Sequence, residues 1–174
     1  MLLRSIPAII FLTALSGCNF IKRTPVDPAT LQTAATEAVL RYTIEHCPRR
    51  KEAKLAVIAI GEYMSEPTPE FVNRFKDVPG LEFIDFKRPV AGMKKGKSRR
   101  FDEQTQENVL ELQIGSITEA KDGKQEAVAA WAFEDDAGRK RLEVKEKAGG
   151  GYEIRELENI PVPNRNDDRS APGK

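Results

Sequence analysis

Short alternating segments in the last third of the chain constrain its fold more than any other feature. Leu110, Leu112 and Ile114 are separated by single polar residues, and a later segment repeats the pattern with Leu142 and Val144. A period of two residues is typical of a strand with one buried face. The pattern therefore predicts strands that lie side by side on a common core.

Turn signals separate these segments. Asp122-Gly123 is typical of a tight hairpin, and residues 135–138 and 149–151 mark two further turns, the last one before a strand that begins at Tyr152. The intervening segment 127–133 is apolar on both faces, which favours a central strand. Four strands joined by three short turns predict an antiparallel meander.

Two helices and two strands are predicted before the meander. Apolar residues recur at helical spacing from Pro28 to Cys47, and Thr68-Pro69 begins a second, shorter helix. Residues 54–60 and 81–86 form apolar segments of strand length. The fold class is therefore α+β, with one or two helices packed on a mostly antiparallel sheet that ends in a four-stranded meander.

The amino terminus has the features of an export signal. Arg4 precedes an apolar run from Ile6 to Leu15, which is about half the length of a membrane span. The run ends in Leu15-Ser16-Gly17-Cys18, which resembles the lipobox of bacterial lipoproteins. The order of the elements behind it is also similar to small α+β lipoprotein domains of unknown function.

The resemblance implies a lipid anchor. In that family the cysteine, here Cys18, is linked to diacylglycerol, and the chain is cut just before it. The product would be a membrane-anchored envelope protein, and Asn19 favours the periplasmic face of the outer membrane in a Gram-negative source. The expected organisation is a signal peptide (1–17), a lipidated cysteine with its tether (18–28), an α+β domain (29–158) and a disordered tail (159–174).

The charge balance excludes a nucleic-acid partner. The full chain has 28 basic and 27 acidic residues, and removal of Arg4 with the signal leaves equal numbers. A chain without net charge has no overall field that favours a polyanion, and export removes it from nucleic acid.

Cys47 has no partner within the chain if Cys18 carries lipid. A buried apolar cysteine at the end of a helix is the favoured interpretation, and an intermolecular disulfide or a reactive thiol is the alternative. The single histidine, His46, is adjacent to it, and neighbouring residues on a helix do not face each other. The pair is therefore a poor catalytic or metal-binding arrangement.

The sequence has no catalytic motif, and we expect no metal and no cofactor. Glu62 and Glu66, near the end of the first predicted strand, are general acid–base candidates by location alone.

A basic segment is the strongest local anomaly. Residues 87–100 contain seven lysines and arginines and no acid. Gly92 and Gly96 within it favour a long exposed loop. The side chains expected to contact an anionic surface are Lys94, Lys95, Lys97, Arg99 and Arg100. The alternative is a solvated loop balanced by nearby acids.

Three functional classes remain open from the sequence. The favoured one is a non-catalytic envelope lipoprotein that binds a partner protein of the envelope or an anionic polymer through its sheet or its basic segment. The alternative is a small-molecule or lipid binder with a pocket between the first helix and the sheet. An enzyme is the least favoured class, because it requires convergent polar groups in a cleft.

Overall fold

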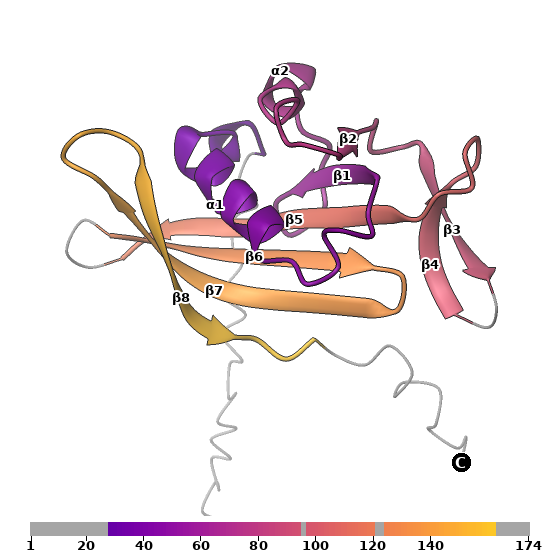
Figure 1. The fold of residues 1–174 in the computed structure, drawn as a ribbon. Coiled ribbons are helices and arrows are strands. Elements are labelled where there is room, and N and C mark those ends of the chain that lie inside the picture. The colour runs from indigo at the N-terminus through magenta and orange to yellow at the C-terminus, as the bar shows by residue number, and fades with distance from the viewer. Residues whose placement is uncertain (1–27, 95–96, 121–123, 163–174) are drawn as a thin grey trace, which may run out of the picture.

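The structure is a computed structural model that describes residues 28–94, 97–120 and 124–162 (Figure 1). In chain order its elements are a 3₁₀ turn η1 (Pro28–Leu31), α1 (Ala34–Glu45), β1 (Leu55–Ile60), α2 (Pro69–Asn73), β2 (Glu82–Phe83), β3 (Pro89–Lys94), β4 (Lys97–Asp102), β5 (Val109–Glu119), β6 (Gln125–Phe133), β7 (Asp136–Glu146) and β8 (Tyr152–Asn159). Among the described residues, no helix is long and apolar enough to span a membrane.

Six of the strands form one sheet in the order β2-β1-β5-β6-β7-β8. β1 pairs in parallel with both β2 and β5, and every later pair is antiparallel. Helix α1 lies across one face of this sheet (Figure 1). The predicted α+β class and the four-stranded meander are confirmed, although the turn at Asp122-Gly123 lies outside the described residues.

Helix α1 begins later than the sequence pattern predicts. Residues 28–31 form a separate 3₁₀ turn, and the Oγ1 atom of Thr33 caps α1 by accepting a hydrogen bond from the backbone N–H of Thr36 at 3.2 Å. The hydroxyl of Thr36 donates to the carbonyl of Leu31, which links the turn to the helix. A threonine at this position satisfies a backbone donor that the first helical turn leaves free.

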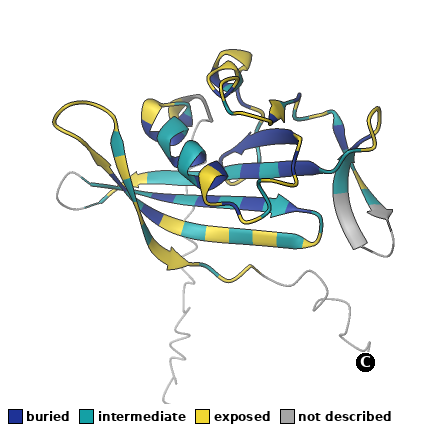
Figure 2. Ribbon diagram, in the orientation of Figure 1, coloured by how far each residue is buried: buried dark blue, intermediate teal, exposed yellow. Residues whose placement is uncertain are grey.

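Both faces of the sheet are covered at the β1 end. All six residues of β1 are buried. Ala56, Ile58 and Ile60 belong to the core beneath α1, whereas Leu55 and Val57 belong to a smaller cluster on the opposite face. In Figure 2 burial is continuous along β1, whereas it alternates along most of β7 and along the first part of β8. This difference explains why the first strand is apolar at every position and the later strands are not.

The prediction of a long loop over residues 87–100 is wrong. β3 and β4 pair as an antiparallel hairpin over Pro89–Asp102, at one end of the six-stranded sheet (Figure 1). Gly92 does not interrupt the strand, because the ring of Phe101 occupies the space above it. A Cβ atom on Gly92 would lie 2.6 Å from Cε1 of Phe101. The glycine therefore makes room for an aromatic ring within the hairpin.

Asn159, the first residue of the expected tail, is the last residue of β8, and the backbone N–H of Ile160 donates to the carbonyl of Arg139 at 2.8 Å. Residues 163–174 of the expected tail lie outside the described residues, as do residues 1–27, which contain the expected signal peptide, Cys18 and most of the expected tether.

Candidate functional site

The β3–β4 hairpin brings the basic positions together at its tip. Lys94 lies directly opposite Lys97, and Gly92 lies opposite Arg99. Opposite positions of a strand pair share a face and successive positions alternate, so the register places positions 94, 97 and 99 on one face of the hairpin. Arg100 belongs to the other face, and Lys95 lies outside the described residues.

A buried carboxylate fixes the base of this hairpin. Asp102, the last residue of β4, is completely buried. Its two carboxylate oxygens accept hydrogen bonds from Nε and Nη2 of Arg88 at 2.6 and 2.9 Å. The backbone N–H and the hydroxyl of Thr105 donate to the same carboxylate at 2.9 and 2.7 Å. A fork-to-fork pair of this kind fixes both distance and orientation.

This arrangement favours the ionised form of the carboxyl group. The Arg88 guanidinium, aided by Thr105, lowers the pKa of Asp102 to about 2 although burial opposes the shift. The charge of Arg88 is therefore neutralised by Asp102 within the protein.

Arg100 is also committed at the base. Its guanidinium lies 3.4 Å from a carboxylate oxygen of Glu111, donates to the carbonyl of Pro89 at 3.2 Å, and sits 5.4 Å from the centre of the Phe86 ring. Three-quarters of its side chain is shielded from solvent. Arg100, which joins the hairpin to β5, thus differs from the tip positions, although the basic sequence pattern predicts the same role for all of them.

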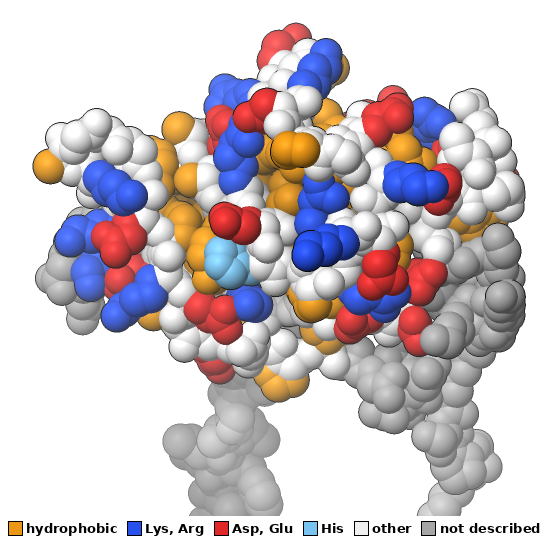
Figure 3. Space-filling view, viewed as in Figure 1, with side chains coloured by type: hydrophobic (Ala, Val, Ile, Leu, Met, Phe, Trp, Pro, Cys, Tyr) orange, Lys and Arg blue, Asp and Glu red, His pale blue; other side chains and the backbone are white. Residues whose placement is uncertain are grey.

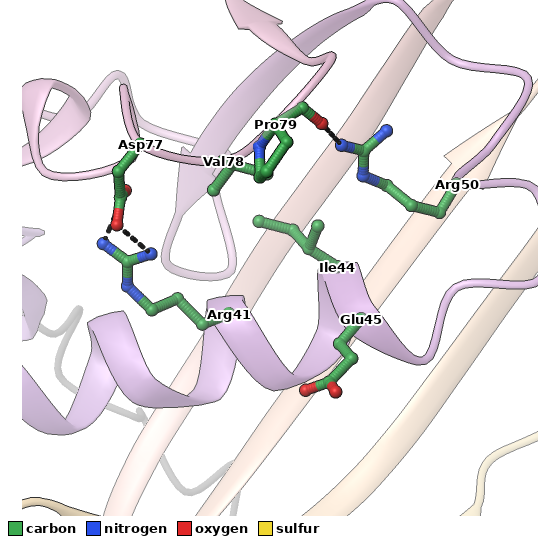
Figure 4. A pocket seen from close by; sticks show the side chains of 7 residues that line it. All are labelled: Arg41, Ile44, Glu45, Arg50, Asp77, Val78 and Pro79. Atoms are coloured by element: carbon green, nitrogen blue, oxygen red, sulfur yellow. Dashed lines mark hydrogen bonds and ion pairs between the residues drawn. The ribbon is translucent and has the colours of Figure 1, made fainter.

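A hollow that the sequence analysis did not predict lies between α1 and the segment after α2. It has a volume of about 380 Å³ and is lined by Arg41, Ile44, Glu45, Arg50, Asp77, Val78 and Pro79 (Figure 4). Arg41 binds both carboxylate oxygens of Asp77, at 3.1 and 2.9 Å, and Arg50 donates to the carbonyl of Pro79. Both guanidinium groups are thus used to hold the two segments together. No sequence motif marks this hollow, because its residues come from separate segments.

The space between α1 and the sheet is much smaller. It is lined by Tyr42, Thr43, His46, Ala129, Trp131 and Lys140, and its volume is about 10 Å³. This volume suits one water molecule, whereas small-molecule sites typically have about 300–1,000 Å³.

The other residues that the sequence offers as reactive candidates, Cys47, His46 and Glu66, lie in contacts that favour a structural role. Cys47 is buried, and burial raises the pKa of its thiol above the ordinary value, which disfavours the reactive thiolate. The His46 ring stacks on Tyr42 with centroids 3.9 Å apart. Glu66 forms an ion pair with Lys87 at 2.8 Å. Within the described part of the chain, no group of three or more histidine, cysteine or acidic side chains is arranged to hold a metal ion.

In comparisons with known proteins, no family model, curated protein or solved structure matches the chain. Inferences about function therefore depend on the residues of this chain alone.

Proposed function

We propose that the protein is a bacterial envelope lipoprotein anchored by lipid on Cys18, and that it acts as a non-catalytic interaction module. In this proposal the tip of the β3–β4 hairpin contacts an anionic surface near the membrane that holds the anchor. The short tether supports this geometry, because residues 19–28 span at most about 33 Å when fully extended.

The observation that carries the proposal is the placement of Lys94 opposite Lys97. Like charges directly across a strand pair destabilise it, so folding alone gives no reason for this pairing. The arginines at the base have acidic partners, whereas the sequence from Lys87 to Phe101 contains no acid. Local conflicts of this kind occur at functional sites, and here an external anion would relieve the repulsion.

The expected strength of the contact is modest. Each lysine or arginine at an anionic lipid surface contributes about 1 kcal/mol, and the contribution falls off within a Debye length of about 8 Å at physiological salt. Such a contact orients a protein that is already anchored and does not replace the anchor.

Vesicle binding tests the proposal. The chain from Asn19 onward retains every described residue and can be titrated with phosphatidylcholine vesicles with and without phosphatidylglycerol. Replacement of Lys94, Lys95 and Lys97 by glutamine should weaken binding to the anionic vesicles by about 100-fold, the equivalent of about 3 kcal/mol.

A charge-matched control distinguishes an effect of the hairpin lysines from an effect of the total charge of the protein. Lys51, Lys76 and Lys147 are exposed and lie outside the hairpin, and their replacement by glutamine changes the net charge equally. The control should bind like the parent chain. Equal binding by both triple variants would show that the hairpin has no special role.

The anchor has a separate test. The intact mass of protein extracted from membranes should correspond to a chain that starts at Cys18 and carries acyl groups. A Cys18→Ala precursor that is still cut before residue 18 would contradict the lipid anchor.

A further inference from the structure

Strand β8 forms a long open edge of the six-stranded sheet. It pairs with β7 on one side, and among the described residues no strand pairs with its other side. The opposite edge of the sheet, β2, has only two residues. A strand of eight residues with a free edge is a template for pairing with another chain.

The hydrogen bonds of the β7–β8 pair determine which backbone groups are free. The N–H of Lys147 donates to the carbonyl of Gly151 at 3.0 Å, and these two residues are opposite each other in the register that pairs Glu146 with Tyr152. In an antiparallel pair, bonded and non-bonded positions alternate. Tyr152, Ile154 and Glu156 are therefore non-bonded positions toward β7, and their N–H and C=O groups point away from the sheet.

We propose that β8 pairs with β8 of a second copy of this chain. In this pairing the two strands run antiparallel about a twofold axis at Ile154. Tyr152, Ile154 and Glu156 of each copy then each donate and accept one backbone hydrogen bond. The two six-stranded sheets join edge to edge, and α1 lies on the same face of both.

Charge complementarity selects this register. With the axis at Ile154, Glu153 of each copy lies opposite Arg155 of the other copy, so the exposed face gains two opposite-charge pairs. An axis at Glu153 or at Arg155 also satisfies the hydrogen-bond alternation. Each of those registers places two like charges directly opposite each other. Of these three registers, the Ile154 register alone avoids this repulsion.

The other face of the strand is also suited to the pairing. Ile154 is half-buried and packs against the main core, so its meeting with the same residue of the second copy extends apolar contact beneath α1. Glu156 is held by Lys140 within each copy. The charge of Glu156 is therefore already neutralised within its own chain, and in the dimer Glu156 lies opposite Tyr152 of the second copy. The mixture of acidic and basic side chains on the described surface is visible in Figure 3.

Single cysteines on β8 test the register. The background is the full-length chain with Cys47→Ala. In the anchored protein the thiol of Cys18 is blocked by the proposed lipid. A single cysteine is then placed in turn at positions 153, 154 and 155. At an Ile154 axis the two 154 positions lie about 5.5 Å apart, within disulfide range, whereas diagonal positions are about 7–8 Å apart. Ile154→Cys should give the covalent dimer most rapidly. Faster dimer formation by Glu153→Cys or Arg155→Cys would overturn the proposed register.

A charge exchange tests the interface without cysteine. Glu153→Arg and Arg155→Glu each convert two attractive pairs into two repulsive ones, so each should raise the dimer dissociation constant about tenfold in sedimentation of the detergent-extracted protein. The double variant should restore parental association. Lys145→Glu is the matched control, because Lys145 is exposed on β7, opposite Glu153 within one chain.

The outcomes separate this inference from the proposed membrane contact. A monomeric parent protein at every concentration, or a dimer that neither single exchange weakens, would overturn the β8 interface. Neither result would affect the vesicle-binding prediction, since the variants lie on β8 and not on β3 or β4.

Discussion

The two hairpins β3–β4 and β7–β8 arrange their charges in opposite ways. In β7–β8, cations and acids alternate between the strands. Ion pairs join Lys140 to Glu156, Arg141 to Glu158 and Glu143 to Arg155. In β3–β4 the two ion pairs that the structure describes, Arg88–Asp102 and Arg100–Glu111, lie at the base, and the tip positions are basic on both strands.

This difference shows how a chain with almost no net charge can still present a local field. Opposite charges across β7–β8 lie within 3.4 Å of each other, whereas the sequence of β3–β4 has no acid between Lys87 and Phe101. Charge distribution, and not net charge, therefore distinguishes the two hairpins.

The largest expected effect is a loss of folding stability. Each hairpin has a glycine that lies against an aromatic ring, Gly138 in β7 and Gly92 in β3. A Cβ atom on Gly138 of β7 would lie 2.4 Å from Nε1 of Trp131, whose side chain is only 7% exposed and packs in the main core. Gly138→Ala should lower the free energy of unfolding by about 1–3 kcal/mol. The measurement is the urea midpoint of unfolding.

Gly92→Ala is the matched comparison on β3. Its Cβ atom would meet the Phe101 ring, which is partly exposed and can shift. The expected loss is smaller, below about 1 kcal/mol. Equal losses at both glycines would contradict the expectation that the buried Trp131 ring yields less readily than the partly exposed Phe101 ring.

The next effect converts the charge pattern of one hairpin into that of the other. Lys97→Glu places an acid opposite Lys94, as in β7–β8. Hydrogen exchange in β3 and β4 should slow, because a repulsive cross-strand pair becomes attractive. Binding to phosphatidylglycerol vesicles should weaken by about 30-fold, since two units of charge are lost at about 1 kcal/mol each. If Lys97→Glu lowered both the protection of the hairpin from hydrogen exchange and the affinity for vesicles, the lysine pair would have a structural role, and a functional origin of the pair would be contradicted.

A third effect depends on pH. The folded-state pKa of Asp102 is about 2, below the ordinary value of 3.8. Its ionic contribution to stability is therefore complete above about pH 5 and is lost as the pH falls toward 2. Asp102→Asn should unfold at lower urea than the parent protein at pH 6, and the difference should shrink toward pH 2.

Asp77→Asn is the control for this effect. Asp77 is also paired with an arginine, and Arg41 lowers its pKa, but its side chain is 68% exposed. Solvent screening should make its pH-dependent contribution smaller. A difference between Asp102→Asn and the parent that stays constant from pH 6 to pH 2 would exclude the carboxylate as its source.

The smallest effect is expected on the exposed face of β7–β8. The side chains of Arg141 and Glu158 are 46% and 54% exposed, and their charged atoms are 3.4 Å apart. Arg141→Gln should change the free energy of unfolding by less than about 1 kcal/mol, and added salt should reduce the change further. It should leave vesicle binding unchanged. A loss of vesicle affinity in this variant would mean that the contact surface extends beyond β3–β4.

The sequence predicts the meander and the buried first strand well, because hydrophobic alternation and continuous apolar runs report directly on burial. Thr68 also identifies the start of α2, since a capping threonine before proline is a local signal. These features depend on residues close together in the chain.

The parts that the sequence did not predict depend on distant contacts. Gly92 favours a loop until the ring of Phe101 is placed above it, and Arg100 cannot be distinguished from its basic neighbours until Glu111 and Phe86 are placed beside it. The parallel addition of β1 to β5 requires a connection that no turn motif marks. The same holds for the hollow near Arg41, whose lining residues come from two separate segments.

The most direct test compares the two hairpins beside a membrane. In a Cys47→Ala background, protein extracted with its proposed lipid anchor on Cys18 carries an environment-sensitive fluorophore on a cysteine that replaces either Ser98 in β4 or Lys147, which follows β7. Nitroxide lipids in phosphatidylglycerol vesicles should quench the label at position 98 more strongly, and high salt should remove the difference. Equal quenching at the two positions, or stronger quenching at position 147, would contradict contact through the β3–β4 tip.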